Sequence, residues 1–253
     1  MIGAGITGLA VCKFLSRLEL KVLLVDEGAV AERLSGSLPE SVTLAENFSL
    51  DKIAEFDTFH FAVPSPGVDL NGPLMGELKS REVIILSEFD LAIACLGMPR
   101  VAVTGTNGKT TTVNIIHEMF LAAGEDSRLV GNVGRPFIEE AAEINPIELR
   151  SILRAVPASV DRAGDFSQNF SVAEMSSYQL DCLVEFSPNV AVFLNIEDDH
   201  LERHRDFDSY FAAKKRIFSS DDSENWSLIC LNTQCFEDVL MAAGEKRLLF
   251  GVA

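Results

Sequence analysis

The chain has 253 residues, with 38 Asp or Glu against 21 Lys or Arg and a formal net charge of −17. Hydrophobic residues make up 47% of the sequence, which suffices for one large or two ordinary folded domains and excludes a disordered chain. The acidic balance repels a phosphate backbone and an anionic membrane surface, so neither nucleic acid nor a membrane is an expected partner. The five cysteines form no CxxC pair, which is typical of reduced thiols in a cytoplasmic protein. We also expect the chain to be a monomer.

Strand-like and helix-like patterns alternate along the first hundred residues. Short apolar runs lie at residues 21–27, 57–64 and 81–88, and amphipathic stretches such as residues 9–18 separate them. This alternation predicts βαβ units around a parallel sheet, and therefore an α/β fold of the Rossmann-like kind.

A glycine-rich motif opens the sequence. Gly3, Gly5 and Gly8 form GxGxxG, and Asp26 stands at the end of the next predicted strand, where a carboxylate can accept hydrogen bonds from a nucleotide's sugar or base. The glycines would let a diphosphate approach the backbone, although a turn that merely packs a helix on a strand has the same pattern. Because so few residues precede Gly3, we expect the first strand to be truncated.

A second α/β series follows a loop at residues 95–100. The expected domains are residues 1–97 and 98–253, with the second cut off at its carboxyl end. Residues 145–169 are irregular and are interpreted as a surface insertion. The series contains apolar runs at residues 100–105, 170–176, 189–197, 226–232 and 246–252, and a helix from Thr110 to Ala123.

The strongest signal is VAVTGTNGKTTT at residues 101–112, which predicts a strand, a glycine loop and a helix. In such a phosphate-binding loop, backbone N–H groups and the helix N-terminus face an anion. Lys109 would place a positive charge on the outer phosphates of ATP, and the hydroxyl of Thr110 or Thr111 could bind Mg²⁺. The loop is shorter than the strict GxxxxGK[ST] pattern, but the physical logic is the same.

Polar residues follow the later apolar runs. Asn132, Glu174 and His200 stand where the carboxyl ends of parallel strands would meet, so Glu174 and His200 are candidate ligands of a second Mg²⁺, although each taken singly could be an ordinary surface residue. The i, i+4 spacing of His200 and His204 could suggest zinc, but neither HExxH nor a nearby cysteine accompanies it. By periodicity alone, Lys214 is a surface lysine whose stem covers apolar neighbours.

The segments VTGTNGKTTT, GNVGRPF, EMSSYQL, LNIEDDHLERH and YFAAKKRIF, in this order, resemble the Mur ligases. Within that family, GAGITGLA, PSPGV and GNVGRP are similar to the type that joins D-glutamate to UDP-N-acetylmuramoyl-L-alanine (the MurD type). The resemblance implies amide formation through an acyl phosphate, with ATP and two Mg²⁺ ions, in peptidoglycan precursor synthesis. It also implies that the family's third, C-terminal domain, which contacts D-glutamate and ATP, is missing from this sequence.

The resemblance implies roles for individual residues. Asn132 and Ser176 would line the substrate's route to the γ-phosphate, Lys109 would act on the transferring phosphate, and Lys214 matches a lysine that the family carbamylates to help hold metal. Mg²⁺ would be held by Thr110, Glu174 and His200. The UDP part of the substrate would contact Gly5, Ile6, Thr7, Gly8, Asp26, Glu27, Ser65, Pro66 and Gly67, and the ATP phosphates would contact Gly105, Thr106, Asn107, Gly108, Lys109, Thr110 and Thr111.

Three functions remain open at this point. The first is the ligase, or part of one. The second is a noncatalytic module that binds ATP and the UDP-sugar without reaction. The third is a P-loop ATPase or kinase unrelated to wall synthesis, which leaves EMSSYQL and DDHLERH unexplained.

Overall fold

The computed structural model describes residues 1–55, 59–97, 101–143, 170–184, 186–197, 204, 206–218 and 225–251. It divides into two compact units, Met1–Cys95 with Pro136–Ala163, and Leu96–Arg135 with Gly164–Ala253. The expected insertion at residues 145–169 lies outside the described residues. None of the described helices is both long and apolar enough to cross a membrane.

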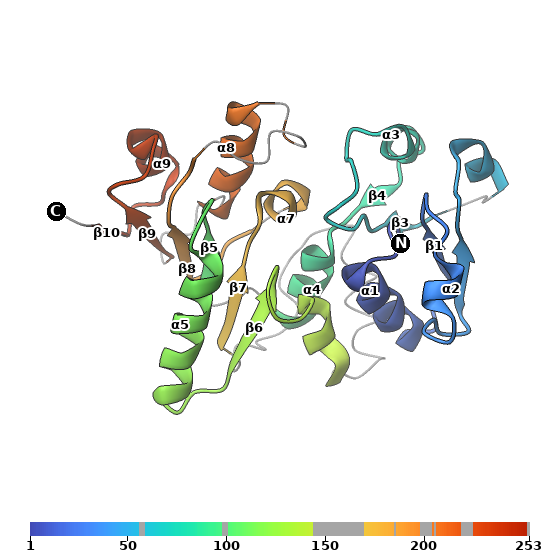
Figure 1. The fold of residues 1–253 in the computed structure, drawn as a ribbon, viewed down its shortest axis with the longest axis horizontal. Coiled ribbons are helices and arrows are strands. Elements are labelled where there is room, and N and C mark those ends of the chain that lie inside the picture. Colours follow the sequence, from blue (N-terminus) through green and yellow to red (C-terminus); the bar gives the residue numbers. More distant parts are fainter. Residues whose placement is uncertain are drawn as a thin grey trace. The chain divides into compact units, whose positions relative to one another are not determined.

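The first unit contains short parallel pairs of strands with helices between them (Figure 1). β1 pairs with β2 and β3 pairs with β4. Ile2 bridges both pairs, since it lies parallel to Val25 on one side and to Pro64 on the other. The elements are α1 (Ile6–Arg17), β1 (Val22–Val25), α2 (Ala31–Leu34), β2 (Val42–Ala45), η1 (Leu50–Glu55), β3 (Phe61–Ala62), α3 (Pro73–Ser80), β4 (Ile84–Ile85), α4 (Glu88–Leu96) and η2 (Phe137–Glu143).

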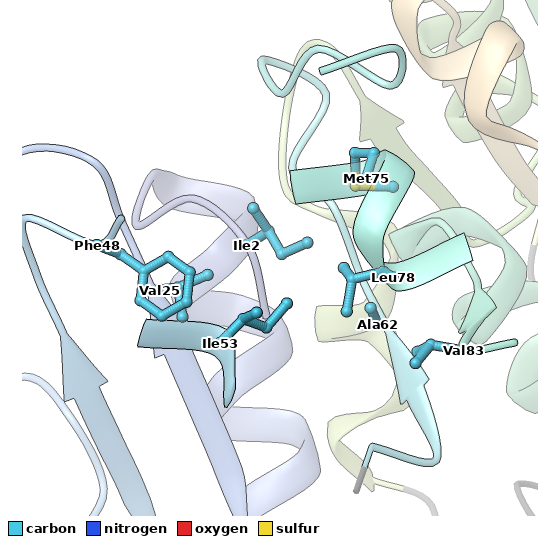
Figure 2. Close-up of a cluster of buried hydrophobic side chains, with 8 residues drawn as sticks. All are labelled: Ile2, Val25, Phe48, Ile53, Ala62, Met75, Leu78 and Val83. Carbon is cyan, nitrogen blue, oxygen red and sulfur yellow. The ribbon is translucent and has the colours of Figure 1, made fainter. Parts of the chain in front are cut away.

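Ile2 also anchors the core of this unit. Figure 2 shows its side chain between residues of the β1 side and residues of the β3–α3 side. Met75 is completely buried in the same cluster, and truncating such a side chain to Ala typically costs about 2 to 5 kcal/mol. The cluster consists of Ile2, Val25, Phe48, Ile53, Ala62, Met75, Leu78 and Val83.

Residues 136–143 belong to the first unit, although we expected them in the second domain. The backbone N–H of Ile138 donates a hydrogen bond to the Glu88 carboxylate at 2.6 Å. The rings of Phe89 and Phe137 pack with their centroids 5.4 Å apart. Contacts between α4 and η2, which lie some 50 positions apart in the sequence, cannot be read from local periodicity.

Six described strands of the second unit form one parallel sheet in the order β10-β9-β8-β5-β7-β6 (Figure 1). β5 is buried along its whole length, with β7 and β8 as neighbours. The α/β class with parallel sheets is confirmed. The elements are β5 (Val101–Thr104), α5 (Lys109–Ala122), β6 (Ser127–Gly131), β7 (Phe170–Glu174), α7 (Ser177–Cys182), β8 (Val190–Phe193), α8 (Phe207–Lys215), η3 (Arg216–Phe218), β9 (Trp226–Cys230), α9 (Phe236–Ala242) and β10 (Arg247–Phe250).

Candidate functional site

The predicted phosphate loop connects β5 to α5. Residues 105–108 form the loop, and Gly108 is the N-cap of α5. The first N–H groups of a helix have no partner within the helix, so this end of α5 can receive an anion. The Lys109 ammonium folds back and donates to the carbonyl oxygens of Gly105 (2.9 Å) and Thr106 (2.8 Å). Thr111 is exposed on the first turn of α5.

Glu174 ends β7 beside this loop, and its side chain is almost completely buried. One carboxylate oxygen accepts a hydrogen bond from the Thr110 hydroxyl at 2.8 Å, and the other accepts one from the Asn132 side-chain amide at 2.8 Å. The structure therefore brings together three residues that are predicted for the site. A carboxylate beside a hydroxyl is a donor set that suits Mg²⁺.

Gly131 explains how Asn132 reaches Glu174. Gly131 has φ +99°, and a Cβ atom there would collide with the Glu174 carbonyl oxygen. The absence of a side chain lets the backbones meet, and the Asn132 N–H donates to the same carbonyl at 3.0 Å. This glycine of GNVGRP is thus needed for close approach rather than for flexibility.

Lys214 lies on α8 and is 1% exposed, so the interpretation as a surface lysine is wrong. Its ammonium donates to the Gly105 carbonyl at 2.7 Å and lies 4.8 Å from the centroid of the Tyr210 ring. Lys109 donates to that same carbonyl. Two ammonium groups on one oxygen repel each other, and an anion bound at the loop would relieve this repulsion.

His200 lies outside the described residues, so its role as a metal ligand stays a prediction. Among the residues that are described, no group of three or more His, Cys, Asp or Glu side chains could hold a metal ion. His204, which the sequence paired with His200, instead shares a hydrogen bond with Ser177 through Nε2 at 3.0 Å. It also stacks on Tyr178 with ring centroids 5.3 Å apart.

Ser176 is the N-cap of α7. Its hydroxyl accepts from the Gln179 N–H at 3.2 Å and donates to the Gln179 side-chain oxygen at 2.8 Å. The Ser176 N–H also donates to that Gln179 oxygen at 3.0 Å, and this bond together with the first one forms a capping box, which fixes the start of α7 shortly after the strand that carries Glu174. The Ser176 hydroxyl is engaged in this cap, and its place on the route of the substrate stays a prediction.

Sequence reasoning missed the segment that follows β8. The Glu197 N–H donates to the Thr106 hydroxyl at 3.0 Å, and this hydroxyl also lies 3.1 Å from the Tyr210 hydroxyl. Asn195 contacts the backbone of Asn107 from the same segment. In the sequence, LNIE ends the apolar run at residues 189–197 and begins the segment LNIEDDHLERH, but no role was predicted for Asn195 or Glu197.

The glycine motif forms a tight turn in the first unit. A Cβ atom on Gly8 would collide with the Gly3 carbonyl oxygen, so α1 can begin against the turn only with glycine there. Asp26 supports the turn by accepting from the Ala4 N–H at 2.7 Å. The Ser65 hydroxyl donates to the Gly3 carbonyl at 3.1 Å, so PSPGV adjoins the motif.

The remaining residues predicted for UDP binding lie next to these in the chain. Ile6 is 79% exposed on the first turn of α1. Asn132 and Ser176 belong to the second compact unit, so the predicted UDP-substrate residues divide between the two units. In the first unit, the other residues predicted to contact UDP are Gly5, Ile6, Thr7, Gly8, Glu27, Pro66 and Gly67.

Comparison with known proteins agrees with this geometry. Residues 103–251 match the family model of the Mur ligase middle domain. A UDP-N-acetylmuramoylalanine--D-glutamate ligase of Geobacter metallireducens is 35% identical over 236 residues, which are 90% of this chain and 46% of that protein. Another of the same name from Alkaliphilus oremlandii is 32% identical over 253 residues, covering 98% of this chain and 50% of that protein. The chain therefore spans about half the length of the curated relatives it matches.

Solved structures show the same fold at lower identity. The chain is similar to a UDP-N-acetylmuramate:L-alanyl-gamma-D-glutamyl-meso-diaminopimelate ligase from Neisseria meningitides, with a TM-score of 0.58 and 18% identity over 99% of this chain and 76% of that one. A murein peptide ligase from Psychrobacter arcticus gives a TM-score of 0.53 at 19% identity, over 99% of this chain and 52% of that one. The family model covers more than half of the chain, and the residues that it spans include the phosphate loop, Glu174 and Lys214. The chain belongs to the Mur ligase family.

Proposed function

We propose that the protein is an ATP-dependent ligase that joins D-glutamate to UDP-N-acetylmuramoyl-L-alanine in peptidoglycan precursor synthesis. The observation that carries this proposal is the position of Glu174, which is buried and hydrogen-bonded to both Thr110 of the phosphate loop and Asn132. The relatives that are named as D-glutamate ligases support the choice of substrates.

The phosphate loop would bind the ATP phosphates through the N–H groups at the start of α5. Lys109 would leave its two carbonyl partners for the outer phosphates, because a full negative charge attracts an ammonium more strongly than carbonyl dipoles do. Thr110 would help hold the first Mg²⁺, and Glu174 and His200 would hold the second. These ions would neutralise the charge that develops on the transferring phosphoryl group.

The reaction follows from these charges. A carboxylate oxygen of the alanyl substrate attacks the γ-phosphorus, and the bond between the γ-phosphorus and the oxygen that bridges it to the β-phosphate breaks. ADP departs as the leaving group, and the substrate becomes an acyl phosphate. Lys109 offsets the repulsion between the two anions. The amine of D-glutamate then attacks the activated carbonyl, loses a proton, and the tetrahedral intermediate collapses to an amide with release of phosphate. Asn132 and Ser176 would line the path along which the substrate carboxylate approaches.

The first unit would hold the UDP part of the substrate at the glycine turn. Asp26 and Ser65 keep the turn in shape through bonds to Ala4 and Gly3. The N-terminus of α1 would then face the diphosphate. The exposed side chain of Ile6 would be covered by the bound nucleotide, which gives its exposure a purpose.

Lys214 would act as a carbamate. The ammonium would first lose one proton, and the neutral amine would then add to CO₂ and lose a second proton, so that a buried cation becomes an anion. That anion would lie within reach of Lys109, since both lysines contact the Gly105 carbonyl, and it could help hold the metal. A ¹³C NMR spectrum in labelled bicarbonate should show a carbamate signal that Lys214→Ala abolishes and Lys215→Ala keeps; a signal that persists in Lys214→Ala would refute the assignment.

The test of the proposed function is amide formation from labelled D-glutamate. Wild-type protein with UDP-N-acetylmuramoyl-L-alanine and Mg-ATP should release phosphate in equal amount to the amide formed. Lys109→Ala should lower the rate by on the order of 100-fold or more, by analogy with other preorganised groups that stabilise developing charge. Lys215→Ala, on the same unit, is the matched control. Binding of both substrates without amide formation would favour the noncatalytic module, and an unchanged rate in Lys109→Ala would refute the role of this lysine.

A further inference from the structure

We propose that Asn195 is a positioning residue that holds the phosphate loop in the shape that binds a polyphosphate. The inference rests on the proposed function, because it concerns the same nucleotide site. Asn195 lies two residues after the end of β8 and is half-buried. Its Oδ1 accepts from the Asn107 N–H at 2.8 Å, and its Nδ2 donates to the Asn107 carbonyl at 3.0 Å. The Asn195 side-chain amide thus bonds both the N–H and the carbonyl group of Asn107, as the backbone of a neighbouring strand would.

The segment around Asn195 is itself anchored. The Thr106 N–H donates to the Asn195 carbonyl at 3.1 Å, and the Glu197 N–H donates to the Thr106 hydroxyl at 3.0 Å. Between them, the Ile196 N–H donates to the hydroxyl of Thr233 at 3.1 Å, and both of these residues are buried. Because the loop that follows β9 anchors residues 195–197 through this bond, the segment can serve as a rigid support for the phosphate loop.

The contacts with Asn195 determine which backbone N–H groups of the phosphate loop are available to the ligand. The N–H groups of Thr106 and Asn107 are both used by Asn195, which leaves the N–H groups at the N-terminus of α5 for the phosphates. A loop that is already held in its binding shape does not need to be ordered when ATP arrives. Loss of two ordinary hydrogen bonds should therefore weaken Mg-ATP binding by roughly 10- to 30-fold.

The experiment compares Asn195→Ala with Asn225→Ala in the full chain. Asn225 is a matched control, since its side chain donates to the Ser187 hydroxyl at 2.7 Å just before β9, at the edge of the sheet opposite to the phosphate loop. Calorimetry measures the Kd of Mg-ATP, and thermal unfolding measures stability. Amide hydrogen exchange at Asn107 reports directly on the clamp, by which we mean the two hydrogen bonds between the Asn195 side chain and the Asn107 backbone. A general loss of stability would speed exchange at many amides and not at Asn107 alone.

We expect Asn195→Ala to raise the Kd by roughly 10- to 30-fold and to speed exchange at Asn107, with a melting temperature near that of Asn225→Ala. An unchanged Kd in a folded Asn195→Ala would overturn the proposal. If Asn195→Ala does not fold, exchange in the wild type decides: protection of the Asn107 amide supports the clamp, and exchange at the rate of a free peptide overturns it. If the wild type binds no Mg-ATP, the proposed function fails, and exchange at Asn107 still judges the clamp separately.

Discussion

Replacing Glu88 by Gln should remove a pH dependence from the stability of the first unit. Glu88 is 5% exposed. Burial raises the pKa of its carboxyl from 4.5 to about 7; the nearby carboxylates of Glu139 and Asp90 add to the rise, and the Ile138 N–H opposes it. Because the folded state holds this proton more tightly than the unfolded chain, the stabilisation is complete below pH 4.5 and is lost as pH rises through about 7.

The size of the effect follows from the two pKa values. A rise from 4.5 to about 7, at about 1.4 kcal/mol per unit, corresponds to roughly 3 kcal/mol in total. Most of this loss, roughly 2 to 3 kcal/mol, falls between about pH 5 and pH 8. Gln cannot ionise in this range, and the cost of burying its amide does not change with pH. The difference in free energy of unfolding, Glu88→Gln minus wild type, should therefore increase by this amount as pH rises.

The assay is urea unfolding across this pH range, followed by pulsed hydrogen exchange of peptides from the first unit. Glu32→Gln is the control, because Glu32 is exposed on α2 of the same unit. Its difference from the wild type should stay nearly constant with pH. If the curves of wild type and Glu88→Gln run parallel from about pH 5 to pH 8, the reasoning on buried Glu88 is refuted.

Two further predictions concern close packing and buried thiols. Gly131→Ala should destabilise the second unit by about 1 to 3 kcal/mol and weaken Mg-ATP binding, since its methyl group would push the backbone away from the Glu174 carbonyl; unfolding curves and calorimetry check this, and unchanged values would contradict it. Burial raises the pKa of the Cys12 thiol to about 11 and that of the Cys95 thiol to about 12, so Ellman's reagent at mildly alkaline pH should modify both only after unfolding. Rapid modification in the folded protein would show that these sites open.

The sequence predicts those parts of the fold that depend on local pattern. The helix expected at Thr110–Ala123 is observed at Lys109–Ala122, and the apolar runs at residues 170–176 and 189–197 contain β7 and β8. These elements are long or strongly apolar, and the glycine loop at residues 105–108 marks where the helix begins. β2 and β6 were not predicted, because polar residues that are exposed, Thr43 and Arg128, interrupt their apolar residues.

The rest of the site depends on contacts that local pattern does not encode. The burial of Lys214 arises because α8 packs it toward the Gly105 carbonyl, 109 positions away in the chain. Asn195 and Asn107 are 88 positions apart. Periodicity could only describe Lys214 as amphipathic, and nothing local distinguishes Asn195 from any polar residue at a strand end.

The most direct test of the proposed ligase function is calorimetric titration of the chain with UDP-N-acetylmuramoyl-L-alanine, and separately with Mg-ATP. Both compounds should bind the wild type, and Lys109→Ala should lose Mg-ATP binding and still bind the UDP compound. Failure of the UDP compound to bind a sample that is shown to be folded would contradict the assignment as a D-glutamate ligase and would leave a phosphate-binding member of the Mur ligase family with another substrate.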